Sequence, residues 1–139
     1  DTFIRHKEKF TREGNMFGLF GNRSKGEIRR LNKDAGDIIE YACQSFRTET
    51  VRDAALMTAE HLARAHDIFE SGVIGLKRGI DEYKRLHNEA RRKRDDAALT
   101  AFTLVQIYLR AEIQGEACKP ACDAIDQFIA DWEHAQKEE

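Results

Sequence analysis

Apolar residues are most concentrated at residues 97–113, where twelve of seventeen positions are hydrophobic. Placed on a helix, these side chains cover most of the circumference, and Thr103, Gln106 and Arg110 form one narrow polar stripe. A membrane-spanning helix needs about 20 apolar residues with few charges. This run is shorter, and Arg110 and Glu112 interrupt its end. The pattern therefore predicts a buried central helix rather than a membrane span.

Four further stretches have apolar residues at three- and four-residue spacing, which predicts four more helices. The expected helices lie at about 24–46, 51–70, 74–93, 96–114 and 120–134. Local capping signals support these bounds: a capping box at Ser24 and Glu27, Asp95 or Asp96 at the start of the central helix, and Gly115 at its end. The sequence thus predicts an all-α fold, a compact antiparallel bundle of four or five helices.

The break between the second and third helices has two interpretations. Gly72 and Gly75 are costly inside a helix and favour a turn. The apolar register nevertheless continues from residue 73 to residue 90, so one long helix over 51–93 is the alternative.

A short internal echo suggests how the last four helices are arranged. The sequence Asp-Ala-Ala-Leu occurs at 53–56 and again at 96–99, an offset of 43 residues. Helical repeats have periods of about 34–47 residues. Two similar helical hairpins after an N-terminal helix are therefore one option, and a chance match between two helix starts is the other.

Length and composition favour one soluble domain. The 139 residues are 41% hydrophobic and 35% charged, which suffices for a packed core. Residues 1–15 precede Met16 and lack the continuous apolar segment of a secretory signal. We expect them to be a vector-derived or disordered tail, followed by a single helical domain at 16–139 whose start is typical of a bacterial protein.

The cysteines indicate the cellular compartment. Cys43, Cys118 and Cys122 are an odd number and do not have the spacing of a disulfide framework. A reducing, cytoplasmic location is therefore expected.

Charge is distributed unevenly, although the net charge is only -2. Residues 77–94 carry eight basic and three acidic residues, whereas 112–139 carry eight acidic and two basic residues. The basic stripe is a candidate for binding phosphates, and its strongest candidates are Arg85, Arg91, Arg92 and Arg94. The competing interpretation, which we favour, is a solvated face neutralised by acidic residues one helical turn away.

No established catalytic or metal-binding pattern is present. The sequence lacks nucleophile-elbow and phosphate-loop motifs, and no histidine–carboxylate series matches a metal centre. Cys118 and Cys122 would supply only half of a zinc site. We therefore expect no enzyme activity, no catalytic residues, no metal and no cofactor. A ligand pocket near His66 and Tyr108 is the remaining small-molecule hypothesis.

These observations favour a small cytoplasmic, non-enzymatic protein that acts by binding another protein. The alternatives are a nucleic-acid-binding accessory or regulatory protein and a small-molecule-binding bundle. We also expect a homo-oligomer, most simply a dimer, and no membrane association. We expect a dimer because the apolar faces of 51–70 and 120–134 are wider than one bundle needs to cover, and Phe17, Leu19 and Phe20 also need burial.

Overall fold

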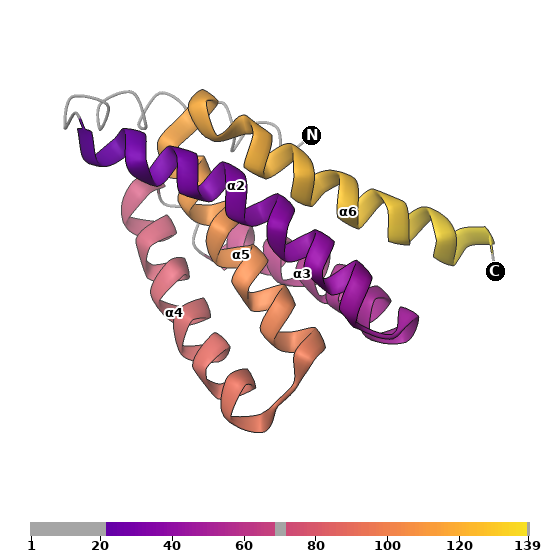
Figure 1. Ribbon diagram of the computed structural model, residues 1–139. Coiled ribbons are helices and arrows are strands. Elements are labelled where there is room, and N and C mark those ends of the chain that lie inside the picture. Colours follow the sequence, from indigo (N-terminus) through magenta and orange to yellow (C-terminus); the bar gives the residue numbers. More distant parts are fainter. Residues whose placement is uncertain (1–21, 69–71, 139) are drawn as a thin grey trace.

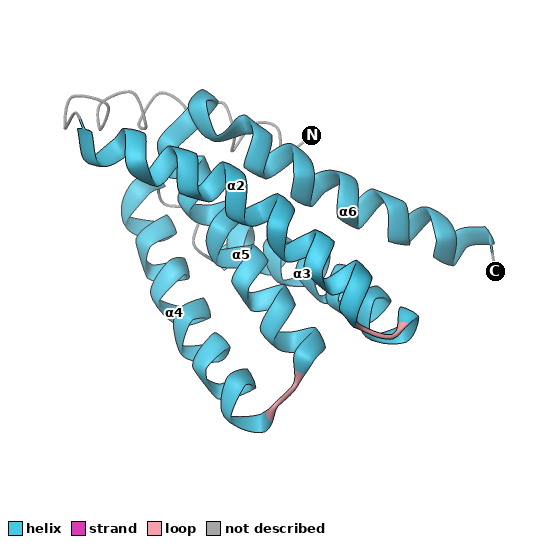
Figure 2. Ribbon diagram, in the orientation of Figure 1, coloured by secondary structure: helices cyan, strands magenta, loops and turns pink. Residues whose placement is uncertain are grey.

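A computed structural model describes residues 22–68 and 72–138. These residues form five α-helices and one 3₁₀ turn, without a strand among them (Figures 1 and 2). The elements are α2 (Asn22–Ser45), α3 (Thr48–Ile68), α4 (Gly72–Lys93), α5 (Asp96–Gln114), η2 (Gly115–Cys118) and α6 (Lys119–Glu138). The all-α prediction is confirmed. The expected tail at residues 1–15 lies outside the described residues.

The helix bounds differ from the expected ones mainly at the ends. α2 begins two residues before Ser24, and α6 continues past His134. Pro120 lies in the first turn of α6, where its missing N–H costs nothing. The 3₁₀ turn between α5 and α6 was not predicted from the sequence.

α5 is the centre of the fold, as its apolar pattern predicts. Eleven of its nineteen residues are buried, and it contacts α2, α3, α4 and α6. The largest fully buried side chains in this helix are Tyr108, Leu104 and Leu109. No helix among the described residues is both long and apolar enough to cross a membrane.

α3 and α4 form a hairpin rather than one helix. His61 in α3 and Tyr83 in α4 have ring centroids 5.5 Å apart. In a continuous helix, 22 residues would separate them by roughly 33 Å. The alternative of one helix over 51–93 is therefore wrong. The chain reverses before α4, which begins at Gly72, whereas Gly75 lies inside α4. Gly72 itself has φ 70°, which a residue with a Cβ rarely adopts.

Successive helices run in opposite directions, which brings α2 and α6 together as a parallel pair (Figure 1). Asn32 joins them: its side-chain amide donates to the carbonyl of Ala117 at 3.0 Å and accepts from the backbone N–H of Ala121 at 3.1 Å. One polar side chain thus satisfies two backbone groups near the start of α6.

The internal echo does not mark equivalent positions. Asp96 is the first residue of α5, whereas Asp53 lies more than one turn inside α3. The chain does form the hairpins α3–α4 and α5–α6, but the repeated four residues occupy different places in them.

Candidate functional site

The predicted basic stripe ends at the corner between α4 and α5. This corner lies at the lower tip of the α4–α5 hairpin, away from α6 (Figure 1). Arg91, Arg92 and Arg94 are all exposed there. We call these three residues the basic corner.

Backbone hydrogen bonds hold this corner in one conformation. The N–H of Asp95 donates to the carbonyl of Ala90 at 3.0 Å, and the N–H of Arg94 donates to that of Arg91 at 3.2 Å. This pair of bonds is a Schellman motif, in which the residue at the turn takes a left-handed conformation. Here that residue is Arg94, with φ 55°. Glycine usually occupies this position, because a residue with a Cβ adopts the left-handed conformation only at some cost in free energy. Arg94 therefore has a strained backbone.

Asp95 is the N-cap of α5. Its side chain accepts a hydrogen bond from the backbone N–H of Ala98 at 3.1 Å, which is the predicted helix cap. The carboxylate of Asp95 is therefore directed into the helix start rather than toward the neighbouring arginines. Two consecutive hydrogen-bonded motifs thus fix the corner: the Schellman motif that ends α4 and the Asp95 cap that starts α5.

Two other basic side chains of α4, Arg85 and Lys93, are neutralised by ion pairs. Arg85 pairs with Glu82 at 2.6 Å and with Glu89 at 3.6 Å, and Lys93 pairs with Glu89 at 2.9 Å. The hydrogen bond to Lys93 and its charge lower the pKa of Glu89. The expected acidic neighbours one helical turn away are present for both side chains, because Glu89 pairs with Arg85 and with Lys93, and Arg85 also pairs with Glu82. Arg85 thus belongs to a salt-bridge network rather than to a free binding surface.

The basic corner lacks such compensation among residues 22–68 and 72–138. None of its three arginines has a carboxylate within ion-pair distance there. Arg92 acts on Glu89 only as a more distant charge. The predicted candidates therefore separate into one neutralised residue, Arg85, and three arginines available to a partner.

His66 and Tyr108 do meet, as the pocket hypothesis requires, with ring centroids 6.3 Å apart. Both are buried, at 6% and 0% exposure. The Tyr108 hydroxyl donates to Asp126 at 3.0 Å, and burial, together with the nearby Cys122 and Asp126, raises the pKa of Tyr108 far above its usual value. These side chains belong to the packed core, and neither of the two clefts described below includes them.

A buried pair accompanies His66. Its Nε2 lies 2.6 Å from Oε1 of Glu112, and its Nδ1 lies 2.7 Å from the carbonyl oxygen of Leu62. Burial acts to lower the pKa of His66, but the hydrogen bond and charge of Glu112 outweigh it and raise the pKa overall. Glu112 Oε2 is buried without a hydrogen-bond partner among the described residues. Because a partnerless buried oxygen is costly, this pair is structurally important.

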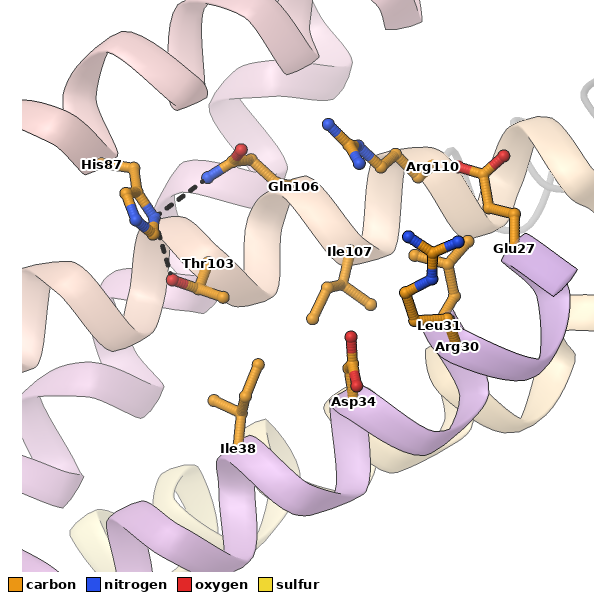
Figure 3. A pocket seen from close by; sticks show the side chains of 10 residues that line it. All are labelled: Glu27, Arg30, Leu31, Asp34, Ile38, His87, Thr103, Gln106, Ile107 and Arg110. Carbon is orange, nitrogen blue, oxygen red and sulfur yellow. Dashed lines mark hydrogen bonds between the residues drawn. The ribbon is translucent and has the colours of Figure 1, made fainter.

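Two open clefts are lined by described residues. One, of about 250 Å³, lies over α4 and α5 beside Met57 and Phe102. The other, of about 190 Å³, runs between α2 and α5 with His87 at one end; we call it the α2–α5 cleft (Figure 3). Its lining is Glu27, Arg30, Leu31, Asp34, Ile38, His87, Thr103, Gln106, Ile107 and Arg110.

The polar stripe of the central helix forms one wall of the α2–α5 cleft. Thr103, Gln106 and Arg110, which form the predicted polar stripe of α5, all line the opening (Figure 3). Sequence analysis identified this stripe but assigned no site to it. Its signal was available, because a polar stripe on an otherwise buried helix must face water or a ligand.

The cysteines and acidic residues offer no metal centre within the described part of the chain. No group of three or more His, Cys, Asp or Glu side chains there could hold a metal ion. The Cys118 thiol is buried, with its Sγ 4.0 Å from the carbonyl oxygen of Ile28. Burial, with a contribution from Glu27, raises the pKa of Cys118 to about 11, so this thiol is a poor nucleophile at neutral pH.

Comparisons with protein-family models, with curated proteins and with solved structures find no match.

Proposed function

We propose that this is a non-enzymatic, cytoplasmic binding protein that holds an acidic segment of a partner protein at the basic corner. The observation that carries the proposal is the contrast within α4. Arg85 and Lys93 are paired with carboxylates, whereas Arg91, Arg92 and Arg94 are exposed without one among the described residues. Arginine is well suited to this role, because its planar guanidinium can bind a carboxylate through two parallel hydrogen bonds.

The corner also limits the conformational cost of binding. The Schellman hydrogen bonds and the Asp95 cap fix the backbone on both sides of Arg94. When a partner binds, the arginines therefore lose conformational entropy in their side chains but little in their backbone. The absence of a catalytic motif from the sequence is consistent with a binding role.

Charge favours a protein partner over a nucleic acid. A DNA-binding surface commonly contacts six to ten phosphates, and whole-protein basicity assists it. This chain has a net charge of -2, and the basic corner has three arginines without a carboxylate within ion-pair distance among the described residues. Three guanidinium groups match a short run of Asp or Glu side chains better than a long phosphate backbone.

A charge-reversal comparison tests the proposal. A short fluorescent oligoglutamate peptide is titrated with the wild-type protein in about 20 mM salt, where exposed charges are weakly screened. Replacing Arg91, Arg92 and Arg94 by Glu should weaken binding by at least about tenfold. The matched control reverses three exposed charges on α2 and just beyond its end: Lys25, Arg29 and Arg47.

The control variant has the same net charge as the corner variant, so a site-specific effect should leave its binding nearly unchanged. Equal weakening in both variants would reduce the effect to overall charge and contradict the proposal. A short labelled DNA duplex is measured in parallel. If the duplex bound more tightly than the peptide and lost binding in the corner variant, the nucleic-acid alternative would replace the protein-binding one.

A further inference from the structure

We propose that the α2–α5 cleft binds a small zwitterion with an aliphatic side chain, of the size and chemistry of a free amino acid such as leucine. This site is separate from the basic corner and goes beyond the protein-binding function. Three features of the cleft support this inference: it is lined by charges of both signs, it has an apolar wall, and its volume is small.

Two acidic and two basic side chains line the cleft. α2 contributes Glu27, Arg30 and Asp34, and α5 contributes Arg110 (Figure 3). Glu27 already accepts a hydrogen bond from Gln114 at 3.1 Å. Within the described residues, Asp34 and Arg110 form no hydrogen bond or ion pair, although both are half-buried.

This combination selects against ligands with one charge. A simple anion would meet Arg110 and Arg30 but would be repelled by Asp34. A simple cation would meet Asp34 but would be repelled by the two arginines. A zwitterion presents a carboxylate to the guanidinium groups and an ammonium to Asp34. It would satisfy the half-buried charges of Asp34 and Arg110, which have lost part of their hydration.

The wall between these charges is apolar. Leu31 and Ile38 from α2 face Ile107 from α5, and Figure 3 shows Ile107 and Asp34 directed toward one another across the opening. An aliphatic side chain would therefore be covered beside the charged groups. The volume of about 190 Å³ is below the roughly 300–1,000 Å³ of pockets for drug-sized ligands. It suits a molecule of amino-acid size.

The far end of the cleft is already ordered. Nδ1 of His87 lies 3.0 Å from Oγ1 of Thr103 and 3.3 Å from Nε2 of Gln106. Thr103 and Gln106 also donate to the backbone carbonyls of Leu99 and Phe102. Burial, followed by the charge of Arg91, lowers the pKa of His87, so its imidazole is mainly neutral near pH 7. This end offers hydrogen bonds without another fixed charge.

Three related compounds test the charge requirement on the wild-type protein. Calorimetric titrations compare leucine with 4-methylpentanoate, which lacks the ammonium group, and with isopentylamine, which lacks the carboxylate. We expect saturable binding of leucine and at least about tenfold weaker binding of either analogue. Absence of saturable leucine binding, or equal binding of all three compounds, would overturn the proposal.

Two variants assign the binding to the cleft. Asp34→Asn removes one charge at nearly constant size, and Arg110→Gln replaces the guanidinium group by a shorter neutral amide. Each should weaken leucine binding by at least about tenfold. Asp37→Asn is the matched control, since Asp37 lies on the same helix, is exposed and pairs with Lys33. Circular dichroism verifies that each variant folds. Undiminished leucine binding in the Asp34 and Arg110 variants would contradict the assignment, whatever the result at the basic corner.

Discussion

Glu112 is a carboxylate inside the core, 4% exposed, and its only described hydrogen bond joins it to His66. The Leu62 carbonyl can only accept, so the proton on Nδ1 of His66 is directed toward it. When protonated, Nε2 donates a hydrogen bond to Oε1 of Glu112. The two contacts orient the imidazole between α3 and α5.

The first prediction concerns removal of this partner. Glu112→Ala should lower the free energy of unfolding by about 3 kcal/mol, because it leaves the buried Nε2 of His66 without Glu112. Glu112→Gln should cost only about 1 kcal/mol, because the amide N–H can donate to a neutral Nε2. Urea unfolding of both variants measures the difference. Equal losses in the two variants would contradict a role for this hydrogen bond.

The second prediction concerns proton affinity. The pKa of His66 is raised, whereas burial, followed by Arg64, lowers that of His61. Relative to an unfolded value of about 6.5, His66 contributes stability below pH 6.5 that is lost as pH rises through its folded pKa. His61 has the opposite sign: its contribution is present above pH 6.5 and is lost as pH falls. An NMR titration of the imidazole signals should find His66 deprotonating at higher pH than His61. The reverse order would contradict this assignment.

Sequence reasoning predicted part of this residue-level picture. It identified His66 and Tyr108 as neighbours because both lie on apolar helix faces. It did not predict the contact between His66 and Glu112, because the 46 intervening residues give no local signal for a tertiary pair. The α2–α5 cleft was missed for the same reason: its polar stripe is visible in α5, but the facing charges come from α2.

At the scale of elements, local signals determined what could be predicted. Asp95 and Gly115 set the ends of α5 through their own hydrogen bonds and backbone geometry, so their roles were readable from the sequence. The turn η2 was not, because no local residue pattern required it. The left-handed conformation of Arg94 was also not predicted, since arginine gives no sequence signal for such a turn position.

The third prediction follows from that turn. Arg94→Gly should stabilise the protein by roughly 1 kcal/mol, because glycine adopts a φ of 55° without strain. Arg92→Gly removes the same charge inside α4 and should destabilise by about 1 kcal/mol, since glycine is unfavourable within a helix. Thermal unfolding of the two variants should therefore shift in opposite directions. A loss of stability in both would contradict the strained-turn interpretation.

At the scale of the whole molecule, the fourth prediction is the homodimer. Among the described residues, the exposed large hydrophobic side chains are Tyr41 and Ile74, at 63% and 68% exposure. Phe128 is buried and Trp132 is half-buried within the bundle, so the apolar surplus expected on α6 is smaller than the sequence indicated. Electrostatic contact between the acidic α6 of one chain and the basic α4 of another is then the main support for association.

Light scattering on a sizing column decides the oligomeric state. A dimer should have about twice the chain mass of 16.0 kDa, and a charge-based dimer should dissociate as salt rises. A mass near that of one chain across micromolar concentrations, at both low and high salt, would contradict the dimer. That outcome would leave the basic corner fully available to a different protein.

The most direct test of the binding function is to map an acidic peptide onto the protein by amide NMR at low salt. Binding to three exposed arginines should be weak, with a Kd of about 1 mM, so fast exchange should allow each signal to be followed. The account predicts that the largest shift changes fall on residues 90–98, around the α4–α5 corner, and disappear when Arg91, Arg92 and Arg94 are replaced by Glu. Shift changes centred on another surface, or no saturable change, would contradict it.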